Sequence, residues 1–326
     1  MTHLEENKWI SDFFSTYFSK KGYFELTPVG ITSHIDKTVY LVNSATNLFK
    51  QYIHTENCRI FVKQRCMRTQ ALDYFYNEEK ESQYPTCFVS FGAYVSKQYM
   101  DKLFLDTVGF LANIGLELSR LRVRVSEEDG MLLEMIESCP IKIKKVIDSQ
   151  KEKYSHTYGD TIMGRAIKVD YFQDSLSRYK NICYIIAMYN EGILCGAELA
   201  SSADLFLLRL KDMEYAISVS AIADILPTEN FYQRRLADSV VAVVNLSVEG
   251  KRPHSSDMSG RTMKKYLRAM SYFGRELKYS EEEIAEICRQ YLIIDYGLDK
   301  NECMSNLERF LSKYYREGDN DDGTII

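Results

Sequence analysis

Strand-like and helix-like segments are segregated along this chain, and that segregation restricts its fold more than any other feature. Apolar runs rich in β-branched and aromatic residues predict strands, and they lie at 38–44, 60–68, 86–95, 121–125, 166–172 and 182–189. Apolar residues at helical spacing predict helices at 5–21, 45–54, 96–116, 202–218 and from Asn230 to the end. We therefore expect an α+β fold, with an antiparallel sheet flanked by helices and followed by an all-helical domain.

Length and pattern together predict two domains and a tail. The 326 residues exceed what one hydrophobic core usually serves. We place the sheet-bearing domain at 1–227, the helical domain at 228–316 and a disordered acidic tail at 317–326.

Charge and cysteine usage exclude several classes of function. A formal net charge of −5 argues against attraction of the whole molecule to nucleic acid, although a local basic patch can still bind it. The eight cysteines form no C-x-x-C pair, and no histidine stands at metal-ligand spacing from one, so we predict no metal site. With no signal peptide, this pattern predicts reduced thiols in the cytoplasm. No apolar run is long enough to cross a bilayer, so no membrane association is expected.

The stretch VKQRCMR (62–68) ends a predicted strand with a guanidinium on an apolar face. Because side chains alternate along a strand, Arg68 shares its face with Ile60, Val62 and Cys66. A cation there needs an anionic partner. From the residues alone, a bound phosphate and the carboxylate of Asp73 are equally good partners.

Several segments, in order, resemble the catalytic core of alanyl-tRNA synthetase, a class II aminoacyl-tRNA synthetase. KQRCMR is similar to the start of that family's motif 2, and CFVSFGAYVSKQYM to the strand that closes it. The opening helix with KKGYFELTPVGITSHIDKTVYLVNSATNLFKQYI resembles the first segment of the family. YGDTIMGRAIKV, SSADLFLLRL and RLADSVVAVVNLSVEGKRPHSSDMSGRTMKKYLRAM follow in the family's order, and the resemblance covers about residues 5–275.

The resemblance implies roles for three residues. Arg68 matches the arginine that holds the α-phosphate of ATP, Phe88 the phenylalanine that stacks on adenine, and Arg209 the motif 3 arginine that reaches the γ-phosphate. ATP and Mg²⁺ are the implied cofactors, with Arg68 and Arg209 as catalytic residues. For Arg209, an ion pair with Asp204 or Asp212 is the alternative interpretation.

Other positions depart from the family pattern. Asp204 and Phe206 stand where motif 3 has glycines, and Ser202 where the family has an aspartate that binds the substrate ammonium. His156 falls near the tryptophan of the alanine pocket, so His156, Ser202 and Asp204 would shape a rebuilt acid pocket. Lys168 replaces a glutamate, and the loop at 69–84 is acidic where the family's is basic. Ordinary alanine charging is therefore not expected.

A basic cluster lies in the segment that resembles the family's tRNA-recognition region. It comprises Arg252, Arg261, Lys264, Lys265 and Arg268, the last four on one helical face. A solvated surface and a contact with the acceptor stem of tRNA are both consistent with it.

Two functions follow from the resemblance. The first is an ATP-dependent ligase that activates an amino acid or another carboxylic acid as an adenylate, for transfer to tRNA, a carrier protein or a small amine. The second is a non-catalytic synthetase paralogue that binds tRNA or a protein partner. A homodimer is a candidate assembly in both cases. If the resemblance is a chance one, the chain is an α+β protein of another kind.

Overall fold

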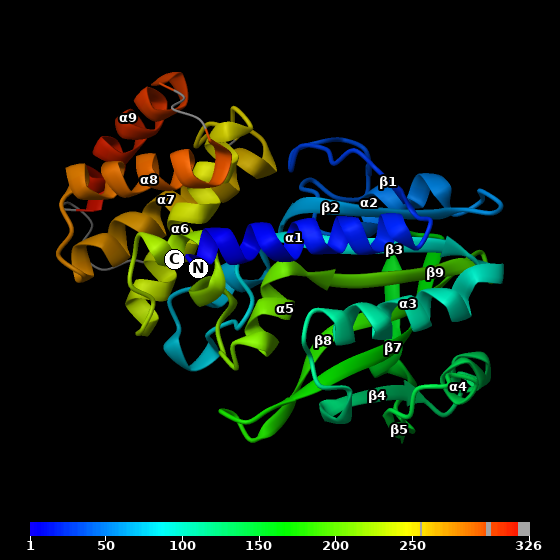
Figure 1. Cartoon of the computed structure of the whole chain (residues 1–326). Coiled ribbons are helices and arrows are strands. Elements are labelled where there is room, and N and C mark those ends of the chain that lie inside the picture. Colours follow the sequence, from blue (N-terminus) through cyan, green and yellow to red (C-terminus); the bar gives the residue numbers. More distant parts are fainter. Residues whose placement is uncertain (255, 298–300, 319–326) are drawn as a thin grey trace.

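One sheet organises the structure (Figure 1). The computed structural model describes residues 1–254, 256–297 and 301–318. Within them the strands are β1 Phe24–Glu25, β2 Arg59–Met67, β3 Cys87–Ser96, β4 Leu121–Ser126, β5 Lys144–Asp148, β6 Ser155–Tyr158, β7 Ile162–Gln173, β8 Arg178–Asn190 and β9 Ile193–Ser202. Their order in the sheet is β1-β2-β3-β9-β8-β7-β4-β5, with β6 paired to β7. The β1–β2 and β4–β5 pairs are parallel and the others antiparallel.

The predicted sheet is confirmed, but one predicted strand is overturned, and β1, β5, β6 and β9 lie outside the predicted strands. β2 and β3 form the expected antiparallel hairpin, in which Cys66 lies opposite Phe88. The segment 38–44 is not a strand: Val42 donates to the carbonyl oxygen of Ile31 and accepts from the amide of Met67, as part of a loop. Of the residues of β9, only Ser202 falls in a predicted element, the helix at 202–218.

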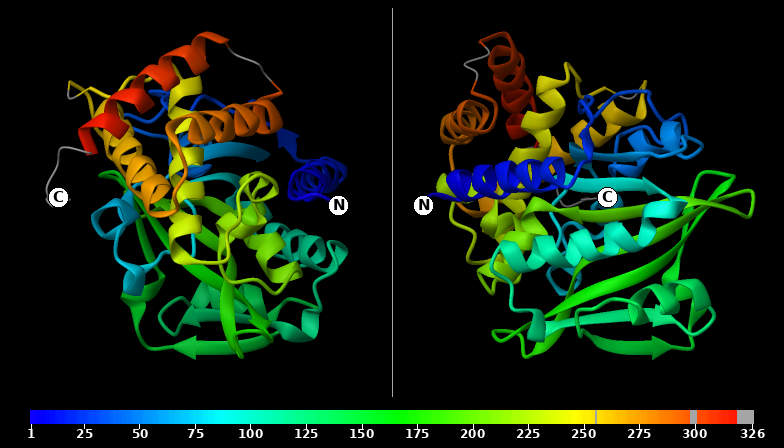
Figure 2. Two further views of the ribbon diagram at one scale, coloured as in Figure 1. Left: turned by 90° about the vertical axis from the view of Figure 1, so that its left-hand side faces the viewer. Right: turned by 45° about the vertical axis from the view of Figure 1, so that its right-hand side comes forward.

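Helices cover the sheet mainly on one face (Figure 2). Their bounds are α1 His3–Lys20, α2 Thr46–Phe49, α3 Met100–Asn113, α4 Gly130–Glu137 and α5 Ala203–Leu210. The N-terminus of α1 is fixed by a capping box between Thr2 and Glu5. At its other end Gly22 adopts a φ of +82°, the left-handed conformation that ends helices.

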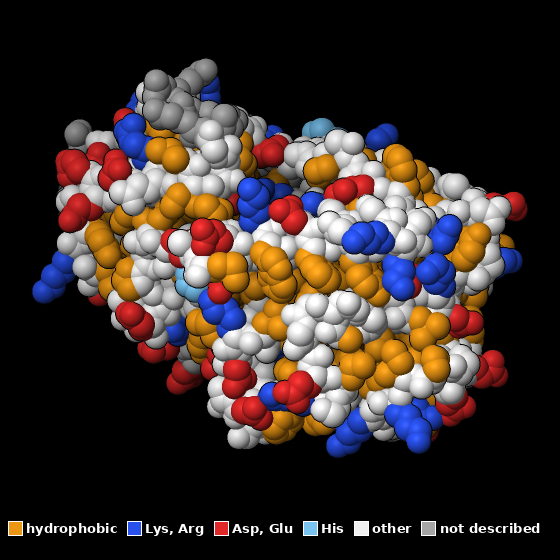
Figure 3. All heavy atoms as spheres, viewed as in Figure 1, with side chains coloured by type: hydrophobic (Ala, Val, Ile, Leu, Met, Phe, Trp, Pro, Cys, Tyr) orange, Lys and Arg blue, Asp and Glu red, His pale blue; other side chains and the backbone are white. Residues whose placement is uncertain are grey.

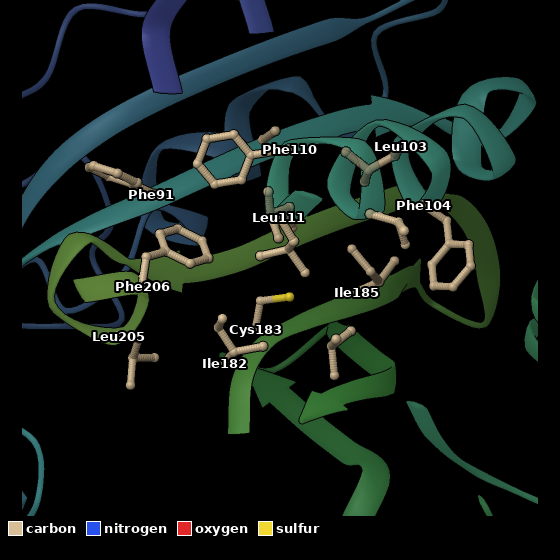
Figure 4. Close-up of a cluster of buried hydrophobic side chains, with 14 of the residues drawn as sticks. Phe91, Leu103, Phe104, Phe110, Leu111, Ile182, Cys183, Ile185, Leu205 and Phe206 are labelled. Carbon is tan, nitrogen blue, oxygen red and sulfur yellow. The ribbon is translucent and has the colours of Figure 1, made fainter. Parts of the chain in front are cut away.

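Aromatic side chains fill much of the space between the sheet and the helices α1, α3 and α5 (Figure 4). Phe14 of α1 stacks on Phe91 of β3 with ring centroids 4.5 Å apart. Phe206 of α5 packs edge-on against Phe110 of α3 at 5.1 Å. The helix α5 is therefore held by the core on the face of the sheet opposite the one that bears Phe88.

The described residues from Phe231 onward are mainly helical, as predicted. The helices are α6 Phe231–Val248, α7 Met258–Glu276, α8 Glu281–Tyr296 and α9 Asn301–Gly318. Their core is continuous with Met67, Phe75 and Cys87 of the sheet-bearing part. The boundary at 227 therefore stays a prediction. α9 takes in the first two residues of the expected tail, and 319–326 lie outside the described residues.

Hydrophobic side chains gather on the face shown in Figure 3. In α1, Trp9 is exposed, and Phe13 and Tyr17 are partly buried. In the described part of the chain, no helix has the length and apolarity that a membrane span requires. All eight cysteines are free thiols. The expected homodimer and the cytoplasmic location stay predictions.

Candidate active site

A cavity of about 380 Å³ lies where the ends of β2, β3, β8 and β9 meet the first turn of α5. Its described lining residues are Ser44, Arg68, Gln70, Ala71, Tyr74, Ser82, Tyr84, Pro85, Thr86, Phe88, Ser90, Asn181, Tyr184, Ala200, Ser201, Ser202, Leu205 and Ala216. Three of the predicted site residues, Arg68, Phe88 and Ser202, are therefore brought together in one cavity.

Arg68 projects from the end of β2, where its amide donates to the carbonyl oxygen of Thr86 over 2.8 Å. Its Nε donates to the main-chain oxygen of Asn43 over 2.9 Å, and its guanidinium carbon lies 4.8 Å from the ring centroid of Phe88. The ion pair with Asp73 that the sequence allowed does not form. The remaining guanidinium N–H groups are therefore available to an anionic ligand.

Ser202 has a structural role in addition to lining the cavity. It is the N-cap of α5, and its hydroxyl accepts from the amide of Leu205 over 3.3 Å. Ser90 lies directly opposite it on β3. The two serines place small polar groups on the cavity floor, next to Phe88.

Glu198 lies on the same face of β9, deeper in the sheet, and is wholly buried. The hydroxyl of Thr46 in α2 donates to its Oε1 over 2.6 Å. No described residue contacts its Oε2 through a hydrogen bond. Burial raises the pKa of Glu198 to about 8, against the opposing effects of the Thr46 bond and the charge of Arg68.

Arg209 does not line the cavity. It is buried in α5, with Nε and Nη2 donating to the main-chain oxygen of Asn181 and Nη1 donating to Oε1 of Gln173. Burial lowers its pKa to about 10. Neither expected carboxylate pairs with it, because Asp212 accepts from the amide of Ser175 instead and Asp204 lies elsewhere. To reach a triphosphate, Arg209 would have to break these bonds.

The other predicted pocket residues also lie outside the lining. Asp204 is buried, and its Oδ2 has no partner among the described residues. Burial raises the pKa of Asp204 to about 7. His156 on β6 is set back from the cavity, with its ring 5.7 Å from that of Tyr184. Phe206 lies in the helix-side core, so its bulk does not enter the cavity.

A second cavity, of about 480 Å³, adjoins the first through Arg68 and Gln70, which line both. It is also lined by Arg261 and Lys265 of α7. The basic residues at 261, 264, 265 and 268 lie on that helix as predicted, and Arg252 lies in the loop before it.

The sequence did not predict β9, so Glu198 and Ala200 were not among the candidate site residues. Tyr184 of β8, which pairs with Ala200, was not among them either. A signal was present. Gly192 stands between two apolar runs, 182–189 and 193–199, which indicates a hairpin turn. In the structure Glu191 and Gly192 both have positive φ, 49° and 80°, as in a two-residue hairpin turn. In this hairpin Asn190 pairs with Ile193, and alternating residues of β9 face the core.

The expected Mg²⁺ does not fit the residues present. In proteins Mg²⁺ is usually bound through one or two carboxylates together with phosphates of the substrate. The described lining contains no Asp or Glu, and Glu198 is enclosed. No described cluster of three or more His, Cys, Asp or Glu is arranged to hold a metal.

Comparison with known proteins finds likeness among solved structures. No family model and no curated protein matches the chain. Apo histidyl-tRNA synthetase from S. aureus is similar with a TM-score of 0.42 and 12% identity, over 63% of this chain and 66% of that chain. The RNA-binding domain of threonyl-tRNA synthetase from Cryptosporidium parvum gives 0.43 and 10%, over 64% of each chain. Asparaginyl-tRNA synthetase from Entamoeba histolytica gives 0.43 and 11%, over 67% and 65%.

This chain thus spans just under two thirds of the length of each of these three chains. The described part of this chain has an antiparallel-dominated sheet flanked by helices, with a C-terminal helical region. None of the three is an alanyl-tRNA synthetase, so the alanyl resemblance stays a prediction.

Proposed function

We propose that this chain is an ATP-dependent ligase of synthetase type, which activates a carboxylic acid as an acyl-adenylate in the Arg68 cavity. The acceptor of the acyl group would be tRNA, a carrier protein or a small amine. In the reaction, a carboxylate oxygen of the acid forms a bond to the α-phosphorus of ATP. The bond from that phosphorus to the bridging oxygen breaks, and pyrophosphate leaves with the bond's electron pair.

The observation that supports this proposal most is the state of Arg68. Its guanidinium lies at the wall of a cavity, paired with no described carboxylate, and is held in place by Phe88 and the oxygen of Asn43. A planar cation positioned in this way suits an α-phosphate. Positioning and charge stabilisation suffice for such a transfer, so no side-chain nucleophile is required.

Asn181 adds a polar contact for the nucleotide. Its side-chain nitrogen donates to the oxygens of Val169 and Cys183, and its buried Oδ1 has no partner among the described residues. Because Asn181 lines the cavity, this oxygen is a candidate acceptor for an amino group or hydroxyl of the ligand.

The test is ATP–pyrophosphate exchange with a panel of acids, together with calorimetric titration of ATP. We expect exchange with at least one acid, and a loss of roughly tenfold or more in ATP affinity for Arg68→Met. Arg59→Met is a matched control, because Arg59 also stacks on a ring, that of Tyr99 at 5.0 Å, at the far end of β2. Absence of both exchange and ATP binding would rule out the ligase.

A non-catalytic RNA-binding function is the second candidate, and the adjoining cavity favours it. Arg68 lines both cavities, and the second one continues to Arg261 and Lys265 of α7. Two nearby acidic residues are already engaged: Asp257 caps α7, and Glu249 accepts from Ile31 and Thr32. An RNA end lying against α7 would place its phosphates beside these cations.

A gel shift with total tRNA in the absence of ATP tests this function. Changing Lys264, Lys265 and Arg268 to Gln should weaken binding, and each lost phosphate contact should lower the salt-dependence slope by roughly 0.7 to 0.9. Lys142→Gln with Lys144→Gln, at the opposite edge of the sheet, is the control. If the variant with all three α7 substitutions binds tRNA as well as the control variant does, the contact does not lie on α7.

A further inference from the structure

The charge of the cavity wall restricts the acid that it accepts. Arg68 is the one charged residue in the described lining, which contains no Asp or Glu. An α-amino acid brings an ammonium group, and burying it without a carboxylate partner is costly. The lining is therefore poorly suited to an ammonium group and better suited to an anion.

A second cation stands beside the cavity, beyond Tyr184. Tyr184 of β8 lines the cavity and lies directly opposite Lys168 of β7. The Lys168 ammonium is 5.8 Å from the ring centroid of Tyr184 and 5.2 Å from that of Tyr154. Directly opposed residues share a face, so Lys168 projects from the same face of the sheet as the cavity, one strand further on.

No described carboxylate forms an ion pair with Lys168, although the charges of Asp170 and Asp148 act on it from a distance. The carboxylate of Asp170 is bonded by both Arg122 and Arg124, over 2.7 Å and 2.6 Å. Burial, followed by the charge of Arg124, lowers the pKa of Lys168. An arriving anion would therefore be attracted by a partly desolvated cation.

His156 provides a polar atom beside this cation. Its ring lies 5.7 Å from that of Tyr184, and its Nε2 is buried with no partner in the described chain. Burial, Lys168 and Arg165 all lower the pKa of His156, which keeps the ring neutral. A neutral imidazole with a proton on Nε2 can donate a hydrogen bond to an anion.

We propose that the acid activated in this cavity is dianionic: it lacks an ammonium group, and Lys168 holds its second anionic group. This inference rests on the ligase function proposed above. The reacting carboxylate lies near the phosphate site at Arg68, and the second group reaches past Tyr184. A second carboxylate and a phosphonate or phosphate share the required chemistry.

The test compares acids in ATP–pyrophosphate exchange with the full chain. The panel contains glutarate, 3-phosphonopropionate, butyrate and alanine. We expect the dianions to exchange at least roughly tenfold faster than butyrate and alanine, and the better dianion identifies the second group. Lys168→Met should raise the apparent KM for the dianion roughly tenfold while kcat changes much less. Lys168→Arg, which keeps the positive charge, should return most of the lost apparent affinity. Lys142→Met, in an exposed segment, is the matched control.

Faster exchange with alanine or another α-amino acid would overturn this inference and leave the ligase standing. Glu198→Gln would then show whether Glu198 binds the ammonium. If no acid supports exchange, calorimetric titration with glutarate alone tests whether the anion site at Lys168 exists. Binding that Lys168→Met weakens and Lys142→Met retains supports the anion site, and absence of binding overturns it. Absence of ATP binding as well would mark failure of the ligase proposal itself.

Discussion

Arg209 donates two hydrogen bonds to the main-chain oxygen of Asn181, at 3.2 Å from Nε and 2.8 Å from Nη2. The residue whose match implies a γ-phosphate contact is therefore bonded to β8 behind the cavity wall. We predict that Arg209→Met lowers the free energy of unfolding by about 2 kcal/mol, because Asn181 and Gln173 lose a charged donor. Urea denaturation followed by circular dichroism measures this.

Arg68→Met is the matched comparison for that prediction. Among the described residues the Arg68 side chain has one hydrogen bond, to a main-chain oxygen, and a ring contact at the cavity wall. Its substitution should cost less than about 1 kcal/mol in stability and act on ligand binding instead. If Arg209→Met is as stable as the wild type but loses ATP affinity, Arg209 leaves Asn181 to bind the nucleotide.

Glu198 gives a pH-dependent prediction. Its folded-state pKa is about 8, against an ordinary value of 4.5, so the folded protein keeps a proton that the unfolded chain releases. The stability that this group contributes is therefore present at low pH and is lost as the pH rises from 4.5 through 8.

Glu198→Gln removes this titration while keeping the side-chain shape. We expect the variant to match the wild type near pH 5 and to be more stable at pH 9 by at least about 1 kcal/mol. Urea denaturation at both values measures the difference, and groups common to both proteins cancel in it. A variant equally destabilised at both values would show that Glu198 is charged in the folded state.

Some features of this structure can be predicted from the sequence, and others depend on contacts between distant residues. The hairpin of β2 and β3 and the position of Arg68 follow from alternation alone, which is a local property. The partners of Arg209 do not, because Asn181 and Gln173 lie 28 and 36 residues away, on two other strands. The apolar residues of 38–44 look like a strand, but tertiary hydrogen bonds to Ile31 and Met67 hold them as a loop.

The candidate site shows the same limit. The family resemblance selects Phe88 and Ser202, which line the cavity, and also Asp204, which does not. Ser202 and Asp204 differ because β9 ends at Ser202 and α5 begins at Ala203. The residue at which the strand ends determines which side chains face the cavity. Missing β9 therefore concealed Glu198 and the direction of Asp204 together.

Gly92 provides a packing prediction for the floor under α2. A Cβ there would meet the Cβ of Ala45 at 2.3 Å and a ring atom of Phe49 at 2.8 Å. Gly92→Ala should lower the free energy of unfolding by about 1 to 3 kcal/mol, because α2 cannot move without disturbing the bond from Thr46 to Glu198. Gly130→Ala is the control, since nothing lies within 4 Å at that position. If Gly92→Ala and Gly130→Ala are equally stable, α2 can shift to accommodate the added methyl group without loss of stability.

Arg65 of β2 and Asp295 of α8 form an ion pair between the sheet and the helical region. We expect this pair to contribute to the free energy of unfolding. Arg65 Nη1 lies 2.5 Å from Asp295 Oδ2, and its guanidinium stacks on Tyr296 at 4.6 Å. Asp295→Asn leaves a mostly buried cation without its carboxylate, so we expect a loss of about 2 kcal/mol. Glu128→Gln breaks the exposed pair with Lys151 and should cost less than about 1 kcal/mol.

A double-mutant cycle with Arg65→Met separates the pair from its surroundings. We expect the double variant to recover part of the loss caused by Asp295→Asn, because it removes the unpaired cation as well as the carboxylate. Urea denaturation of the four proteins measures the coupling energy, which should be at least about 1 kcal/mol. Additive losses would mean that the stacking on Tyr296 and the shared core around Met67, and not the ion pair, hold α8 against the sheet.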